Sequence, residues 1–207
     1  MKKLIVLLVT ISMAMSFFNS CKKGTNDPSI SLRSRDARLI QKWKLTGMTS
    51  TVTSVDTNTI GTTFTTITTT KTFDGTTLSS TMSITNGTTG TTNSTTATST
   101  GSYLLTINKD GTVSYTQTYK ATGVPLETNT GTGTWNWLDA KKSKTDLMLY
   151  LNADYNTSFD FLPTNNPEEC TIDKLSEKEL VLKVSYSSTF NKNTTTTNMT
   201  YTFSQQK

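Results

Sequence analysis

The chain has 207 residues, a length that fits one domain together with a targeting segment. It contains no histidine and two cysteines, which excludes a Ser-His-Asp triad, a Cys-His pair and the commonest zinc ligand. The formal net charge of +5 is dispersed along the sequence, whereas a nucleic-acid-binding protein gathers its basic residues into a patch or stripe.

The N-terminus carries the pattern of an export signal. Lys2 and Lys3 precede an apolar run over residues 4–18, which is shorter than the roughly 20 apolar residues that a bilayer crossing needs. A small residue, Ser20, stands immediately before Cys21. We therefore predict a signal peptide over residues 1–20, with a retained N-terminal anchor helix as the alternative.

The tail Phe18-Asn19-Ser20-Cys21 resembles the lipobox of bacterial lipoproteins, in the looser form found in Bacteroidota, with Phe18 in place of the usual leucine. The resemblance implies that Cys21 receives diacylglycerol. The composition of residues 21–31, mostly Lys, Gly, Thr, Asn, Asp and Pro, predicts a polar tether. Because each buried methylene contributes about 0.8 kcal/mol, several acyl chains would hold the protein in the cell envelope, at the outer membrane, in the periplasm or on the surface. An ordinary cleavage site with an incidental cysteine is the alternative.

After the tether, the sequence predicts one short helix and then β-structure alone. Leu32, Leu39 and Ile40 are spaced to share a helix face, and the arginines among them are interpreted as a solvated face. Threonine supplies roughly a quarter of the chain, far above its normal usage, and its branched Cβ suits a pleated sheet.

From Trp43 onward, apolar residues recur at every second position. The segments with this period are 76–86, 103–107, 113–115, 135–137, 147–151, 159–161, 180–186 and 199–203. One apolar face per strand is typical of antiparallel strands over a single core. Asp74-Gly75 and Asp110-Gly111 predict two-residue hairpin turns. Because closure removes exposed edges, we predict an all-β antiparallel up-and-down barrel of 8–10 strands over residues 32–207.

The Thr-rich hairpin and loop over residues 49–101 fit this pattern least well. Phe64 has one parity, whereas Ile67 and Phe73 have the other. The mismatch would be explained by a β-bulge, or by a strand that projects beyond the barrel and exposes both faces to solvent. Residues 86–101 contain mostly Gly, Thr, Ser and Asn, and we expect them to form a long connection.

Several short motifs, in their order along the chain, resemble the lipocalin-like domains of Bacteroidota lipoproteins. They are Lys42-Trp43-Lys44-Leu45-Thr46-Gly47, residues 104–113, Gly133-Thr134-Trp135-Asn136-Trp137, residues 147–151, and residues 172–176 before 179–182. The resemblance extends from about Leu32 to the C-terminus, apart from the Thr-rich insert. It implies an up-and-down barrel with room for a small apolar ligand, and it brings no catalytic residues.

These observations predict a lipid-anchored exported protein that binds a small hydrophobic ligand at the open end of the barrel. Trp135, Trp137, Tyr115 and Leu105 are the predicted ligand-binding wall, although aromatic residues at strand period also serve as plain core. The alternative is a structural or adhesive surface protein that binds a glycan or a partner protein through its Thr-rich loops. We expect a monomer without cofactor, metal or nucleic-acid partner.

The acidic residues leave a third hypothesis. Asp154, Asp160, Glu168 and Glu169 lie in one stretch, and glycoside hydrolysis needs two carboxyl groups at a set separation. We interpret them instead as a soluble loop and predict no enzyme.

The sequence also contains a partial calcium-loop pattern and a second cysteine, Cys170. Asn152, Asp154 and Asn156 resemble the start of an EF-hand loop, but Thr157 and Pro163 replace its glycine and bidentate glutamate, so a turn is preferred. The carboxylates next to Cys170 disfavour its thiolate, which indicates an idle buried thiol.

Overall fold

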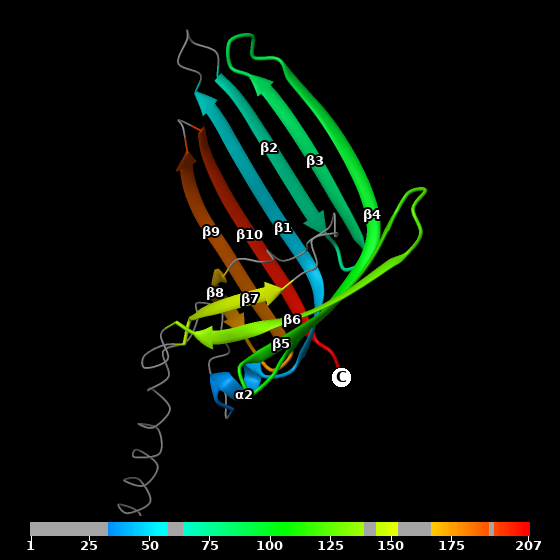
Figure 1. Cartoon of the computed structure of the whole chain (residues 1–207), viewed down its shortest axis with the longest axis vertical. Coiled ribbons are helices and arrows are strands. Elements are labelled where there is room, and N and C mark those ends of the chain that lie inside the picture. Colours follow the sequence, from blue (N-terminus) through cyan, green and yellow to red (C-terminus); the bar gives the residue numbers. More distant parts are fainter. Residues whose placement is uncertain (1–32, 58–63, 139–143, 153–166, 191–192) are drawn as a thin grey trace, which may run out of the picture.

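The computed structural model describes residues 33–57, 64–138, 144–152, 167–190 and 193–207 (Figure 1). The predicted signal peptide, the lipidation site at Cys21 and the tether over 21–31 lie outside the described residues, as does the predicted strand at 159–161. Within the described ranges, no helix combines the length and the apolar character that a bilayer crossing requires.

The described chain begins with a five-residue helix, α2 (Arg35–Leu39), whose first turn is capped by the Ser34 side chain. The interpretation of its arginines as a solvated face is wrong, because Arg35 is 8% and Arg38 4% exposed. Arg38 donates a hydrogen bond to the carbonyl oxygen of Leu175, at the end of strand β8 (Pro167–Leu175). The helix therefore packs against the barrel, and its arginine stems are covered by that contact.

Ten strands follow, and all of their pairings are antiparallel. They are β1 (Lys42–Thr57), β2 (Phe64–Phe73), β3 (Thr77–Asn86), β4 (Thr92–Ile107), β5 (Thr112–Ala121), β6 (Glu127–Trp137), β7 (Asp146–Asn152), β8 (Pro167–Leu175), β9 (Glu179–Phe190) and β10 (Asn193–Gln205). Each strand pairs with the next one, and β1 pairs with β10, which closes the barrel. The predicted all-β antiparallel barrel of 8–10 strands is confirmed.

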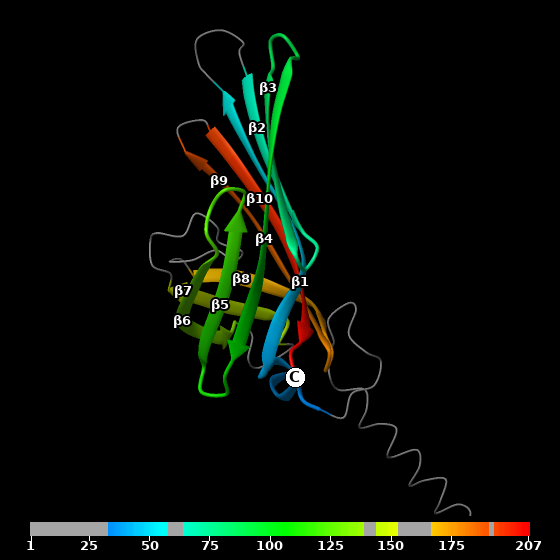
Figure 2. The same cartoon turned by 90° about the vertical axis from the view of Figure 1, so that its right-hand side faces the viewer.

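The barrel has two parts because β1 and β4 also pair directly. Near α2, Trp43 lies opposite Leu105, but farther along the two strands separate and the β2–β3 hairpin fills the gap. Without β2 and β3, eight strands close the lower barrel. The far halves of β9, β10, β1 and β4, together with β2 and β3, form a curved single-layer sheet that rises beyond it, which we call the wing (Figures 1 and 2).

The wing decides the two open questions of the Thr-rich insert. The β2 register is unbroken against both β1 and β3, so no bulge occurs and the strand projects beyond the barrel. The long connection expected over residues 86–101 is wrong, because β4 begins at Thr92 and pairs with β3 up to Thr100. Residues 92–98 are exposed and carry no apolar period, so a strand-forming stretch resembled a loop in the sequence.

Both predicted hairpins are present; the first has the predicted two-residue loop length but is shifted by one residue, and the second is one residue longer than predicted. Asp74 N–H donates to Thr77 O, which leaves Gly75 and Thr76 as the loop. The other hairpin has a three-residue loop that ends at Gly111. Both glycines adopt positive φ, 95° at Gly75 and 84° at Gly111, which favours glycine at these positions. Each aspartate instead accepts backbone N–H groups with its carboxylate, one residue before the glycine.

One continuous core fills the lower barrel. The buried apolar side chains come from α2 and from every strand, and the most completely covered large ones are Trp43, Tyr103, Tyr201, Phe203, Leu39, Leu45, Leu105, Ile107, Leu147, Leu151, Ile172 and Leu175. The period of two found in the sequence thus corresponds to the inward side of the strands.

Candidate functional site

The four residues predicted to form a ligand-binding wall all belong to the packed core or touch it. Leu105, Tyr115 and Trp135 are buried, and Trp137 is partly buried against them. Leu105 and Tyr115 are opposite each other in the β4–β5 register. Trp135 and Trp137 meet edge to face, with ring centroids 5.9 Å apart. The structure therefore brings the four residues together in two neighbouring pairs.

The polar atoms of these aromatic residues have partners within the chain. Trp135 Nε1 donates to Asn108 O at 2.8 Å, and Trp137 Nε1 donates to Asp36 Oδ1 at 2.6 Å. Because Asp36 belongs to α2, the two tryptophans lie at the end of the barrel covered by the helix. Tyr115 stacks on Tyr103 at 5.7 Å, and its hydroxyl donates to Asn152 O at 3.2 Å. Whether any of them also contacts a ligand stays a prediction.

The wing has two faces that differ in chemistry. Its concave face continues the inward side of the barrel strands, as the register shows. Met48 of β1 is buried opposite Tyr201, and Val52, four residues farther along β1, is on the same side. Across the sheet, Val52 pairs with Thr69 of β2, and Thr69 pairs with Met82 of β3. The concave side of each wing strand can be assigned in this way.

Five large hydrophobic side chains are exposed on the concave face. We call them the concave patch: Ile67 (38% exposed), Met82 (44%), Ile84 (38%), Tyr186 (46%) and Phe190 (78%). Ile67 and Ile84 are directly opposite each other on β2 and β3. Tyr186 lies in the row of Val52, through Thr197 of β10. Exposed apolar groups that gather on one face mark an interaction site more often than single ones do.

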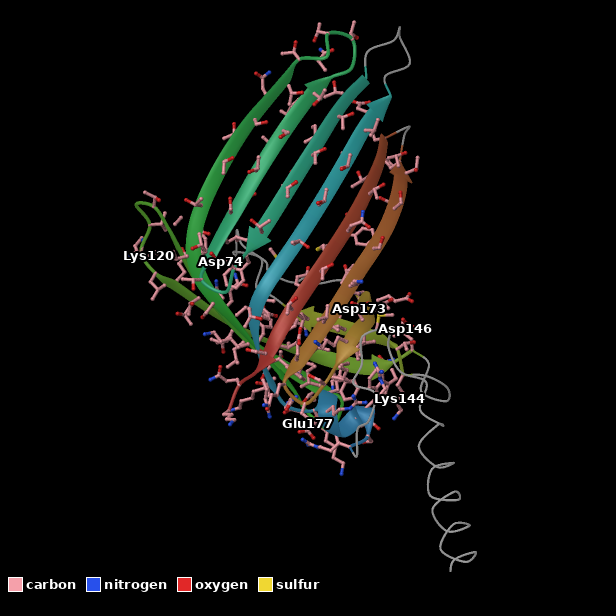
Figure 3. All side chains as sticks on the ribbon, turned by 180° about the vertical axis from the view of Figure 1, so that it is seen from behind. Asp74, Lys120, Lys144, Asp146, Asp173 and Glu177 are labelled. Atoms are coloured by element: carbon pink, nitrogen blue, oxygen red, sulfur yellow. The ribbon has the colours of Figure 1, made fainter. Side chains whose placement is uncertain are left out.

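The convex face of the wing carries hydroxyl groups instead. Serine and threonine side chains of neighbouring strands are hydrogen-bonded in register, as in Thr81–Thr96 (2.9 Å), Ser83–Ser94 (2.8 Å) and Thr189–Thr194 (3.1 Å). Seen from behind, this part of the molecule shows short side chains that end in oxygen, and the labelled charged residues lie below it, around the barrel (Figure 3). Part of the high threonine content of the sequence is thus explained by this surface.

The acidic stretch offers little for catalysis in its described part. Glu168 and Glu169 are consecutive on β8 and point to opposite faces of the strand, so they do not form a pair of facing carboxyl groups. Burial raises the pKa of Glu168. Asp154, Asp160 and the calcium-loop positions Asn156, Thr157 and Pro163 lie outside the described residues. Among the residues that are described, no three carboxyl or thiol groups are arranged for a metal ion.

The thiol of Cys170, on β8, is buried in the core, as the sequence predicted. Burial, reinforced by the charges of Glu168 and Glu169, raises its pKa to about 12. A thiol with so high a pKa contributes almost no thiolate at neutral pH, so it is a poor nucleophile and a poor metal ligand.

Comparison of the chain with protein-family models, with curated proteins and with solved structures finds no match. The function is therefore argued from the geometry of the wing and the barrel.

Sequence reasoning missed the concave patch. The sequence shows the odd or even positions of Ile67, Met82 and Ile84, and so the faces of their own strands. It does not show which strands are neighbours, because that depends on the separation of β1 and β4. Only the register unites residues of β2 and β3 with Tyr186 and Phe190, which are more than 100 positions later in the sequence.

Proposed function

We propose that the chain is a lipid-anchored exported protein that binds a small hydrophobic molecule against the concave patch of the wing. The single observation that carries this proposal is the gathering of Ile67, Met82, Ile84, Tyr186 and Phe190 on one concave face. The closed antiparallel barrel with a short helix at one end supports the lipocalin-like assignment that belongs to this proposal.

An apolar ligand is favoured because its contact would remove exposed hydrophobic side-chain surface from water. Covering a large aliphatic or aromatic side chain completely contributes about 1.5–3 kcal/mol, and the patch residues other than Phe190 are already more than half covered. Each of them therefore offers about 1 kcal/mol to a ligand that lies across the sheet. Two polar side chains in the row of Ile67 and Ile84 would orient polar atoms of the ligand: Asn93 beside Ile84, and Ser54 on β1, between the β2–β3 part and the β9 part of the patch.

A binding titration with a fluorescent long-chain fatty acid tests this site. The double variant Met82→Ser, Ile84→Thr removes apolar surface that is exposed, so the fold should tolerate it. We expect binding at least about tenfold weaker, which corresponds to 1.4 kcal/mol. The matched control is Thr81→Ser, Ser83→Thr on the convex face of the same strand, which should bind as the unchanged protein does.

The same titration examines the wall predicted from the sequence. Trp135→Phe and Tyr115→Phe keep most of the core volume and should leave the affinity unchanged if the ligand lies on the wing. Loss of affinity in these two variants but not in Met82→Ser, Ile84→Thr would move the site into the barrel. Failure of the unchanged protein to bind the probe or any other extractable lipid would contradict a role in hydrophobic ligand binding.

The anchor requires its own experiment. If Cys21 carries the lipid, cells that express the protein should incorporate labelled palmitate into it, and the Cys21→Ala variant should incorporate none. Labelling that persists in the variant would rule out this position. Ser20→Ala, which keeps a small residue before the cysteine, is the matched control and should remain labelled.

A structural or adhesive surface protein is the second candidate, and the convex face favours it. Rows of hydroxyl groups on the wing strands offer donors and acceptors to a glycan or a partner protein. Replacing Thr81 and Ser83 by alanine would weaken such attachment without altering the concave patch. Adhesion of whole cells that depends on these two residues would favour this candidate over the first.

A further inference from the structure

Among the residues that the structure describes, no strand pairs with the outer edge of β9 in the wing. The ladder between β8 and β9 ends at the pair Thr171–Lys183, and beyond it β9 pairs with β10 on its other side. All residues from 185 to 190 are exposed. This stretch contains no lysine, no proline and no register shift against β10, which are the devices that usually protect an edge from pairing with another chain.

The hydrogen-bonding direction along β9 follows from one bond at its start. Gln205 N–H donates to Lys178 O at 2.9 Å, in the same register as the rest of the β9–β10 ladder. Because hydrogen-bonded and non-hydrogen-bonded pairs alternate, the even-numbered residues of β9 bond to β10. Ser185, Ser187 and Thr189 therefore direct their N–H and C=O groups toward the open side.

We propose that two copies of this chain pair through β9, antiparallel, about a two-fold axis at Ser188. In this register Ser187 of each copy forms a hydrogen-bonded pair with Thr189 of the other. Tyr186 then lies opposite Phe190 of the second copy, in a non-hydrogen-bonded pair, where side chains approach most closely. Both aromatic pairs form on the concave face and cover Phe190, the most exposed large hydrophobic residue among those described.

The symmetry of this contact limits it to two chains. Because each β9 edge is used by the other copy, the interface is closed and produces a dimer rather than a fibre. The two wings become one continuous sheet with both concave faces on the same side, and the two α2 ends point away from each other. The inference replaces the monomer expected from the sequence and does not depend on any ligand.

The mass of the exported, purified chain in solution tests the proposal, with Cys21→Ala present to remove the acyl chains. We expect sedimentation velocity to give a dimer. Ser187→Pro should convert it into a monomer, because proline removes an N–H that points to the open side and leaves the β9–β10 ladder intact. Circular dichroism would verify that the variant is folded.

The opposite edge of the wing supplies a matched control. Asn86 N–H donates to Thr91 O, so the even-numbered residues of β4 direct their backbone groups away from β3. Ser94→Pro therefore makes the same change on the β4 edge and should leave the dimer intact. The proposal is overturned if the protein with an unchanged β9 edge is a monomer. It is also overturned if Ser94→Pro dissociates the dimer and Ser187→Pro does not.

A disulfide tests the register. Two cysteines at position 188 would face each other across the axis with Cα atoms about 4.5 Å apart, within the range that a disulfide spans. Ser188→Cys should oxidise to a covalent dimer, since Cys170 is buried and does not compete. Thr95→Cys, which is equally exposed on the concave face at the β4 edge, should stay reduced. A dimer without the Ser188→Cys disulfide overturns this register.

Discussion

Asp36 connects α2 to the barrel through two side chains that are distant in the sequence. Its carboxylate accepts a hydrogen bond from Trp137 Nε1 at 2.6 Å and from Lys144 Nζ at 2.5 Å, and the Lys144 ammonium lies 5.8 Å from the centre of the Trp137 ring. Partial burial raises the pKa of Asp36, but the bonds from Lys144 and Trp137 and the Lys144 charge outweigh this effect. The net pKa is lowered. The ionised form is therefore the one that the folded state favours.

This shift predicts how the stability depends on pH. Because the folded-state pKa of Asp36 is below its unfolded value of about 3.9, its contribution is fully present above pH 4 and is lost as the pH falls through the folded-state pKa. Both partners are more than a quarter exposed, so the contribution at neutral pH should be about 0.2–1 kcal/mol.

Urea unfolding of Asp36→Asn at a series of pH values measures this contribution. The variant should be less stable than the unchanged protein at pH 7, and the difference should shrink toward pH 3. Lys144→Gln should have little further effect in the Asp36→Asn background. A difference that is constant from pH 7 to pH 3 would mean that the Asp36 charge does not act as described.

The tryptophans show how far single residues could be predicted. The period of two identified Trp135 and Trp137 as inward-facing, and the structure buries Trp135 and partly buries Trp137. The contact between Trp137 and Asp36, 101 positions apart, was beyond the sequence because it depends on where the helix packs after the barrel closes. Likewise, the burial of Arg38 follows from its bond to Leu175, which no local pattern encodes.

At the scale of strands, the sequence predicted those that carry apolar residues on one face and missed those that carry none. The strand β3 (Thr77–Asn86) and the inward-facing part of β4 were visible because apolar residues mark every second position. Residues 92–98 of β4 were not, since serine and threonine occupy both faces where the strand leaves the barrel. Their strand structure depends on pairing with β3 and on β-branched propensity, and both are weak signals in a single sequence.

At the scale of the whole molecule, closure was predictable and the wing was not. Alternating strands joined by short connections favour a closed barrel, as observed. The division into barrel and wing arises from one event, the direct pairing of Lys42, Trp43 and Lys44 with residues 104–106. Because of that pairing, β2 and β3 are an insertion into a barrel that is already closed. Nothing in the sequence of these residues distinguishes the β1–β4 pairing from a β1–β2 pairing over the full length of β1.

This division predicts that the lower barrel folds without the insertion. Among the buried apolar side chains of the described residues, only Phe73 and Leu78 lie between positions 49 and 98. A variant in which a short Gly-Asn turn joins Met48 to Ser99 should therefore keep cooperative thermal unfolding and the near-ultraviolet circular dichroism of its tryptophans. Its free energy of unfolding should fall by roughly 3–6 kcal/mol, the contribution of two large buried side chains.

Removal of the β5–β6 hairpin, residues 112–137, is the control and should abolish folding, because it opens the barrel and deletes Trp135. If the chain without residues 49–98 also lacks fixed tertiary structure, the wing strands are an obligatory part of the barrel, and closure through the β1–β4 pairing is not sufficient.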